Sequence, residues 1–150
     1  MRYISILRVL CFAILCGPAT AQMRATFQFD AAFGSRGNGP GQFSDPGALA
    51  LDIAGDVYVA DTGNDRIQKL QPDGTFLREA GGFGWGDGQF RKPSGIAVGK
   101  GLEVYVADSR NHRIQIFSFQ LLLTGIIGGQ DIEASPEFGE LSRVTVTNAN

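Results

Sequence analysis

The chain reads Val57-Tyr-Val-Ala-Asp-Thr-Gly-Asn-Asp-Arg-Ile-Gln-Lys-Leu70 and, 47 residues later, Val104-Tyr-Val-Ala-Asp-Ser-Arg-Asn-His-Arg-Ile-Gln-Ile-Phe117. Nine of these fourteen positions are identical in the two copies. The segments Gly41-Gln-Phe43 and Gly88-Gln-Phe90, each with a proline three residues further on, keep the same spacing. An internal repeat of this period is typical of supersecondary units that stack side by side.

Each copy predicts a β-hairpin, because β-branched and aromatic residues lie on both sides of a short polar loop. In the first copy Gly63 and Asn64 are expected to take the left-handed backbone conformation that closes such a loop. Arg110 replaces the glycine in the second copy, so Asn111 is expected to supply most of the left-handed conformation there.

Two carboxylates and two guanidinium groups recur in register with these loops. Asp61 and Asp108 are expected to accept hydrogen bonds from the N–H groups of their own loops, and Arg66 and Arg113 to close the loops by pairing with them. Because both copies carry these residues, whereas one active site needs no duplicate, we interpret all four as structural.

One period holds four short strands and no helix, which predicts an all-β protein. Antiparallel blades of four strands, joined by tight turns, build a β-propeller. A strand at 27–30 precedes the first full blade, and glycine-rich loops are expected at 34–43 and 81–90. The blade strands are expected at 48–51, 57–60, 66–70 and 76–80, and again at 95–98, 104–107, 113–117 and 121–125.

The run Pro93-Ser-Gly-Ile-Ala-Val98, followed by Val104 to Gln115, resembles the NHL repeat, with the family's Asn-His pair standing at Asn111 and His112. The first copy has Asn64-Asp65 at that place. The resemblance implies repeats at about 27–73 and 74–120, and a degenerate third repeat within 121–150. The tail Phe138-Gly-Glu-Leu-Ser-Arg-Val-Thr-Val-Thr147 resembles the opening of that third repeat.

The first 21 residues have the features of a cleavable secretory signal peptide. A basic start is followed by the apolar run Val9–Cys16 and the small-residue site Ala19-Thr-Ala21. We therefore expect the protein to be exported to the periplasm or the extracellular space, without a transmembrane segment. Cleavage would remove Cys11 and Cys16, so the mature chain would form no disulfide bond.

Composition argues against several function classes. Cleavage would also remove Arg2 and Arg8, two of the 13 basic residues, and none of the 15 acidic ones, so the mature chain is acidic and a poor candidate for nucleic-acid binding. His112 is the single histidine, and with no cysteine left the usual zinc sites cannot be built. No dinucleotide-binding fingerprint is present, and we expect no metal and no cofactor. The acids Asp52 and Asp56 lie in a turn, where a solvated structural role is expected.

The remaining candidates lie on the side where hairpin loops and glycine-rich loops emerge together. We expect a protein- or ligand-binding or scaffold module and no enzyme. The alternatives are a fragment of a lyase- or lactonase-type propeller with catalytic residues elsewhere, or a truncated, non-functional reading frame. Residues 22–150 hold about 2.7 periods, whereas propellers close with roughly 4–8 blades, so an open propeller, completed by self-association or by a longer chain, is expected. The candidate binding residues are Arg36, Asn38, Asn64, Phe83, Trp85, Arg110 and His112.

Overall fold

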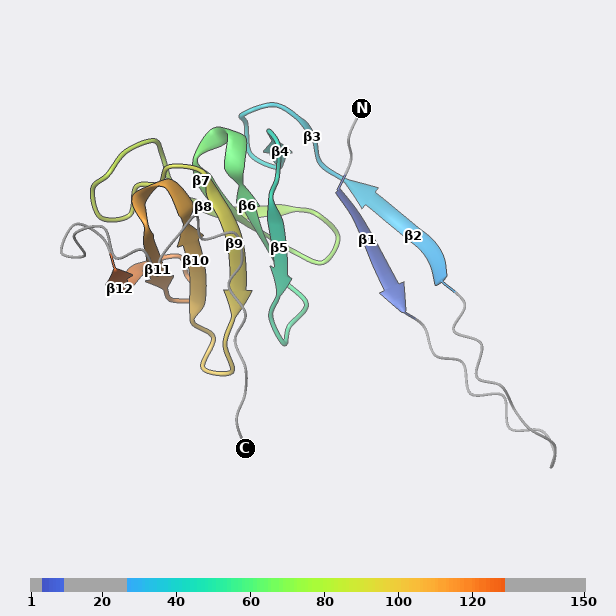
Figure 1. The fold of residues 1–150 in the computed structure, drawn as a ribbon. Helices are drawn as coiled ribbons and strands as arrows, with labels where there is room; N and C mark the ends of the chain where they lie inside the picture. The colour runs from blue at the N-terminus through green and yellow to red at the C-terminus, as the bar shows by residue number, and fades with distance from the viewer. Residues whose placement is uncertain (1–3, 10–26, 129–150) are drawn as a thin grey trace, which may run out of the picture.

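The structure, a computed structural model, describes residues 4–9 and 27–128. Within these ranges the chain is all-β, and its helical segments are two short 3-10 turns, Thr62–Asn64 (η1) and Ser109–Asn111 (η2). None of the helical segments described there is long and apolar enough to cross a membrane. The strands form two four-stranded antiparallel sheets that stand next to one another (Figure 1).

Each sheet is one blade with strands in simple up-and-down order. The first blade runs β5-β6-β7-β8 and the second β9-β10-β11-β12. The inner strands β5 and β9 lie side by side (Figure 1). The strands are β5 (Ala48–Leu51), β6 (Val57–Asp61), β7 (Arg66–Leu70), β8 (Phe76–Gly81), β9 (Pro93–Val98), β10 (Val104–Asp108), β11 (Arg113–Phe117) and β12 (Leu123–Gly128).

Two short pairings precede the first blade. β1 (Ile4–Val9) pairs antiparallel with β2 (Phe27–Phe33), and this ribbon extends away from the blades in Figure 1, with Phe33 at the end of β2 packed against the first blade. β1 lies inside the predicted signal peptide. A chain processed to begin at Gln22 would lack β1. The structure does not test cleavage, which stays a prediction. β3 (Ser35–Arg36) pairs in parallel with β4 (Gln42–Phe43) across the first glycine-rich loop, and a Phe83–Phe90 bridge repeats this in the second loop.

The main hydrophobic core lies between the blades. Tyr58 and Ile67 of the first blade are fully buried against the second blade, where Phe90 and Phe117 pack with ring centroids 5.7 Å apart. The other buried members are Ala60, Ile96, Val104, Val106 and Leu121. Burying side chains of this size is worth about 1.5–3 kcal/mol each, so the blades stabilise one another.

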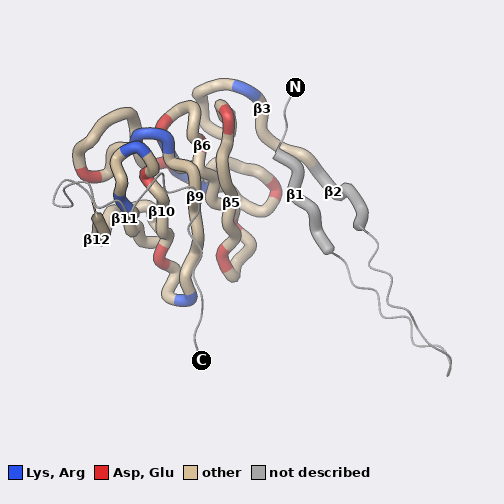
Figure 2. The backbone as a smooth tube through the Cα atoms, viewed as in Figure 1, with Lys and Arg blue, Asp and Glu red and all other residues tan. Residues whose placement is uncertain are grey.

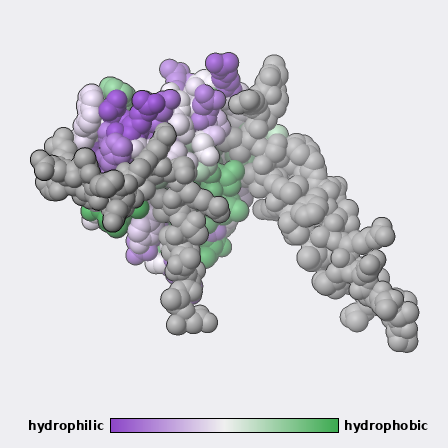
Figure 3. Space-filling model, in the orientation of Figure 1, coloured by the Kyte–Doolittle hydropathy of each residue, from purple (hydrophilic) through white to green (hydrophobic). Residues whose placement is uncertain are grey.

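The side chains of β5 alternate between the two faces of the first blade. Ala48 and Ala50 pack toward the second blade, whereas Leu49 and Leu51 on the opposite face are about half exposed. Hydrophobic surface is visible beside β5 in Figure 3. Successive residues of a strand point to opposite faces, so a propeller blade needs apolar side chains on both.

Polar contacts join the blades at the end where the glycine-rich loops lie. The Thr62 hydroxyl donates to the carbonyl of Pro93, and the Asp65 carboxylate accepts the backbone N–H of Lys92 at 2.7 Å. These bonds place the first blade's hairpin loop directly on the second blade's long loop.

At the opposite end, Lys69 Nζ and the Tyr58 hydroxyl donate hydrogen bonds to the carbonyl of Phe119 in the second blade, at 3.3 and 3.4 Å. Lys69 also pairs with Asp56 at 3.0 Å and Asp52 at 3.6 Å. Burial alone would lower the pKa of Lys69, but hydrogen bonds with Tyr58 and Asp56 raise it overall, and burial raises the pKa of Tyr58. The expectation of a structural turn role is confirmed, because the Asp52 carboxylate accepts the backbone N–H groups of Ala54 and Asp56. The expectation that these acids are solvated is wrong for Asp52, whose side chain is only 5% exposed beside Lys69.

The left-handed residues of the hairpins differ from expectation. Asp65 (φ 52°) and His112 (φ 51°) take that conformation, and Gly63, Asn64 and Asn111 do not. Both left-handed residues follow directly on a 3-10 turn, where the chain must reverse into the next strand. The two asparagines stay in the 3-10 turns, where the Asn64 amide donates to Asp61 and Gly37 and the Asn111 amide donates to Asp108 and Gly84.

The fourth strand of the second blade begins later than its apolar pattern indicates. β12 starts at Leu123, whereas Leu121 adopts a left-handed conformation (φ 58°) in the turn before it. The side chain of Leu121 is buried in the core between the blades, so its hydrophobicity reflects packing and not strand structure.

Candidate functional site

The hairpin loops at 61–65 and 108–112 and the glycine-rich loops at 34–43 and 81–90 emerge at one end of the blades, the upper end in Figure 1. We call this end the loop face. It carries the candidate binding residues derived from the sequence, and its geometry is set by hydrogen bonds between the two kinds of loop.

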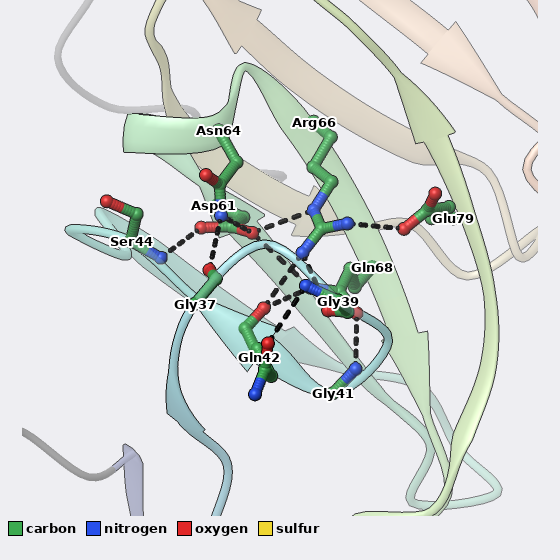
Figure 4. Close-up of polar contacts among 10 residues, drawn as sticks. All are labelled: Gly37, Gly39, Gly41, Gln42, Ser44, Asp61, Asn64, Arg66, Gln68 and Glu79. Atoms are coloured by element: carbon green, nitrogen blue, oxygen red, sulfur yellow. Dashed lines mark hydrogen bonds and ion pairs between the residues drawn. The ribbon is translucent and has the colours of Figure 1, made fainter.

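The carboxylate of Asp61 is the centre of these contacts in the first blade (Figure 4). It accepts the backbone N–H of Ser44 at 2.7 Å, the amide of Asn64 at 2.8 Å and the Nε–H of Arg66 at 2.8 Å. The backbone donor therefore comes from the preceding long loop and not, as expected, from the hairpin loop itself. Asn64 also donates to the carbonyl of Gly37, so the amide ties both loops together.

Arg66 and Gln68 extend this network along the glycine-rich loop (Figure 4). The guanidinium of Arg66 donates to the carbonyls of Gly39 and Gln42, both at 2.9 Å. The Gln68 amide donates to the same Gln42 carbonyl at 2.6 Å and accepts the N–H of Gly41 at 2.9 Å. Gly41 has a φ of 68°, which suits a glycine at this turn.

The second blade repeats the network. Asp108 accepts from Arg91 N–H, Asn111 and Arg113 Nε, each at 2.8 Å. Arg113 also donates to the carbonyls of two residues of its long loop, at 2.7 and 2.8 Å, and Gln115 makes the bonds that its equivalent makes in the first blade. We call each network of Asp, Asn, Arg and Gln a loop frame. Our sequence interpretation missed Gln68 and Gln115. The signal that could have found them is that both copies carry glutamine at the same position of the repeat.

The second long loop carries an exposed aromatic pair. Phe83 and Trp85 are 63% and 57% exposed and meet edge to face, with ring centroids 5.6 Å apart. The guanidinium carbon of Arg91 lies 4.7 Å from the centroid of the Trp85 ring and 5.9 Å from that of Phe83. We call these three residues the aromatic platform. Arg91 was missed from the sequence because its place in the first copy is held by Ser44.

Beside the platform, the loop face has a shallow depression of about 360 Å³ lined by Arg91, Ser109, Arg110 and His112. Figure 2 shows Lys and Arg gathered at this end of the second blade. The sequence-derived candidates thus separate into groups. Phe83 and Trp85 form the platform, and Arg110 and His112 border the depression.

The remaining three candidates lie on the first blade's loops. Arg36 and Asn38 are exposed and line neither the platform nor the depression. Asn64 is bound inside the first loop frame, where its amide is engaged by Asp61 and Gly37. Within residues 4–9 and 27–128, no three His, Cys, Asp or Glu side chains are grouped so that they could hold a metal ion.

A family model described as NHL repeat matches residues 43–70 and 90–117. Each match starts at the phenylalanine of a glycine-rich loop and ends with the second strand of a hairpin. Both matches therefore contain the Asp, Asn, Arg and Gln of one loop frame.

Curated proteins that match parts of the chain include the two described next. The B-box type zinc finger protein ncl-1 of Caenorhabditis elegans is 38% identical over 66 residues, which is 43% of this chain and 8% of that protein. The NHL repeat-containing protein 3 of Homo sapiens is 50% identical over 40 residues, or 27% of this chain and 12% of that protein. The chain thus spans only about a tenth of the length of these relatives.

A solved structure of a streptogramin B lyase superimposes with a TM-score of 0.52 over 74% of this chain and 33% of that one. The sequence identity is 19%, so the likeness shows the arrangement of blades alone. In the described part of this chain, the two four-stranded antiparallel sheets stand side by side without closing a ring.

Proposed function

Because this chain is a partial β-propeller of the NHL repeat type, we propose that it is a protein- or ligand-binding or scaffold module that makes its contacts through the loop face. The observation that carries the proposal is the aromatic platform, in which two exposed aromatic rings lie beside the partly exposed guanidinium of Arg91 on a backbone held by hydrogen bonds. Trp, Tyr and Arg dominate binding energy in protein interfaces, because they combine area with polar contacts.

The loop frame of the second blade holds the backbone of the platform in place. The segment with Phe83 and Trp85 is bound through the carbonyls of Gly84 and Gly86, which accept from Asn111 and Arg113 at 2.9 and 2.7 Å. A surface that is already ordered loses less conformational entropy when it binds. Exposed rings that add little to the core are therefore available for a partner.

Propeller folds host both binding modules and enzymes, so the fold does not decide between them. We propose the non-catalytic role because the loop face offers an exposed contact surface, the aromatic platform. Export through a cleaved signal peptide is part of the same proposal and places the platform in the periplasm or the extracellular space.

A peptide-display selection against the purified chain tests the proposal. Peptides that bind at the loop face should lose at least tenfold in affinity to a Trp85→Ala variant, while the variant unfolds at the same urea concentration as the parent. Ile53→Ala is the matched control, since Ile53 is 90% exposed in the turn at the other end of the blade.

Selected peptides that bind both variants equally would contradict the proposal. An unfolded Trp85→Ala variant would contradict it too, because that outcome would place the ring in the core.

A further inference from the structure

The depression on the loop face of the second blade gathers basic side chains. Arg91, Arg110 and His112 line it together with Ser109. Arg110 and His112 are exposed and Arg91 is partly exposed, so a ligand in the depression can contact all three. These residues belong to the described part of the chain, whereas the tail expected to open a third repeat, Phe138–Thr147, lies outside it.

We propose that this depression binds a carboxylate of an acidic peptide segment, and that an apolar side chain of the same segment lies on the rings of Phe83 and Trp85. The inference rests on the proposed function and names the chemistry of the partner. Arg91 joins the two halves of the site, because it lines the depression and its guanidinium carbon lies 4.7 Å from the centroid of the Trp85 ring. Contacts to an anion and to an apolar group are therefore adjacent.

The basic groups of the depression are not neutralised by acidic side chains of the protein. In the part of the chain whose side chains the structure describes, no carboxylate forms an ion pair with Arg91, Arg110 or His112. The carboxylate of Asp108 is fully buried and accepts from Arg113 Nε at 2.8 Å, so it is engaged inside the loop frame. A guanidinium without a carboxylate partner can bind one through two parallel N–H donors.

The first blade has the same backbone contact at this place without the same charges. Its residues at the equivalent positions are Ser44, Gly63 and Asp65. The N–H of Gly63 donates to the carbonyl of Ser44 at 2.8 Å, and that of Arg110 donates to the carbonyl of Arg91 at 3.1 Å. The two arginine side chains are thus not needed to form the loop. They give the second blade a surface that the first blade lacks.

The distribution of charge favours an acidic peptide over a nucleic acid. Nucleic-acid binding uses a basic surface that follows many phosphates. Here the chain has 15 acidic and 13 basic residues, and Figure 2 shows acidic residues on the loops that neighbour the basic cluster. A depression of about 360 Å³ also suits a carboxylate side chain better than a long polyanion.

A library of random peptides displayed on phage tests the inference on the purified chain. Peptides selected by the parent should be enriched about fivefold or more in Asp and Glu beside an apolar residue, because each exposed ion pair contributes up to about that factor. The enrichment should vanish with an Arg91→Gln/Arg110→Gln variant. Arg36→Gln should keep it and is the matched control, since Arg36 is exposed on the loop face but does not line the depression.

Titrations with one selected peptide separate the charge contact from the ring contact. Replacing its acidic residues by the isosteric amides should weaken binding to the parent about fivefold or more, and leave binding to the glutamine variant unchanged. Trp85→Ala should weaken binding of the acidic and the amide peptide alike. The backbone bonds of both arginines survive the substitution to glutamine, so that variant should unfold at the urea midpoint of the parent. If it is destabilised, Arg110→Gln alone, at an exposed position, gives the same readout.

The outcomes distinguish this inference from the proposed function. Selected peptides that depend on Trp85 but carry no excess of acidic residues would overturn the inference and leave the proposed function standing. A selection that yields no peptide dependent on Trp85 would overturn both. A single-stranded oligonucleotide that displaces the selected peptide and binds more tightly would assign the depression to nucleic acid, and would overturn the inference as well.

Discussion

Asp108→Ala should lower the free energy of unfolding by about 3–5 kcal/mol, the usual cost of removing one partner of a buried ion pair. The Asp108 side chain is fully buried and the Arg113 side chain is 7% exposed, with 2.8 Å between Oδ2 and Nε. Without the carboxylate, Arg113 keeps two backbone carbonyls as acceptors but no counter-charge. Asn111 and Gln115 lose an acceptor in the same step.

Urea unfolding followed by Trp85 fluorescence and by circular dichroism measures the effect. Single domains are stable by about 5–15 kcal/mol, so this loss is a large fraction of the total. For a domain of this size it corresponds to a fall in melting temperature of about 6–20 °C.

The matched control is Asp87→Ala. Asp87 is 79% exposed and lies 3.9 Å from the other side of the same guanidinium, and an exposed pair of this kind contributes at most about 1 kcal/mol. Combining Asp108→Ala with Arg113→Ala should cost less than the sum of the two single variants, because both disrupt one network. If Asp108→Ala shifts the urea midpoint no further than Asp87→Ala, the loop frame has no structural importance.

Three further predictions concern other parts of the chain. Tyr58 and Lys69 both have raised pKa values, so the folded state holds their protons more tightly and stability is lost as the pH rises above about 10. Tyr58→Phe removes one of these protons and the hydrogen bond that raises the Lys69 pKa, so it should flatten that fall in a pH series of urea titrations. Mass spectrometry of the exported protein should find Gln22 at the N-terminus, and an intact first residue would contradict export by cleavage. Light scattering should detect association through the face with Leu49 and Leu51, and a stable, monodisperse monomer would contradict it.

The fold could be predicted from the sequence because two copies constrain each other. The strand-forming runs around Asp61 and Asp108 recur at one spacing, and such a repeat is typical of stacked units whatever their individual propensities. The family model confirmed the NHL repeat, and the likeness to a solved structure confirmed the propeller fold.

Contacts between distant segments were the part that sequence reasoning could not supply. The donor to Asp61 comes from Ser44, and nothing local to the hairpin indicates it. The burial of Asp52 depends on Lys69, and Arg91 reaches Trp85 through the shape of the long loop. Each of these contacts depends on how loops fold back onto strands, which a pattern along the chain does not contain.

The peptides on both sides of Trp85 are fixed by bonds to strand and hairpin side chains, while the ring between them is not needed for any of those bonds. Asn38 occupies the same place in the first blade, between the anchored residues Gly37 and Gly39. The residue at this tip can therefore be exchanged, from an amide to an indole, without altering the backbone that presents it. In the binding role proposed above, such a chain would change its contact surface one blade at a time, because the tip side chain takes no part in the bonds that hold the loop.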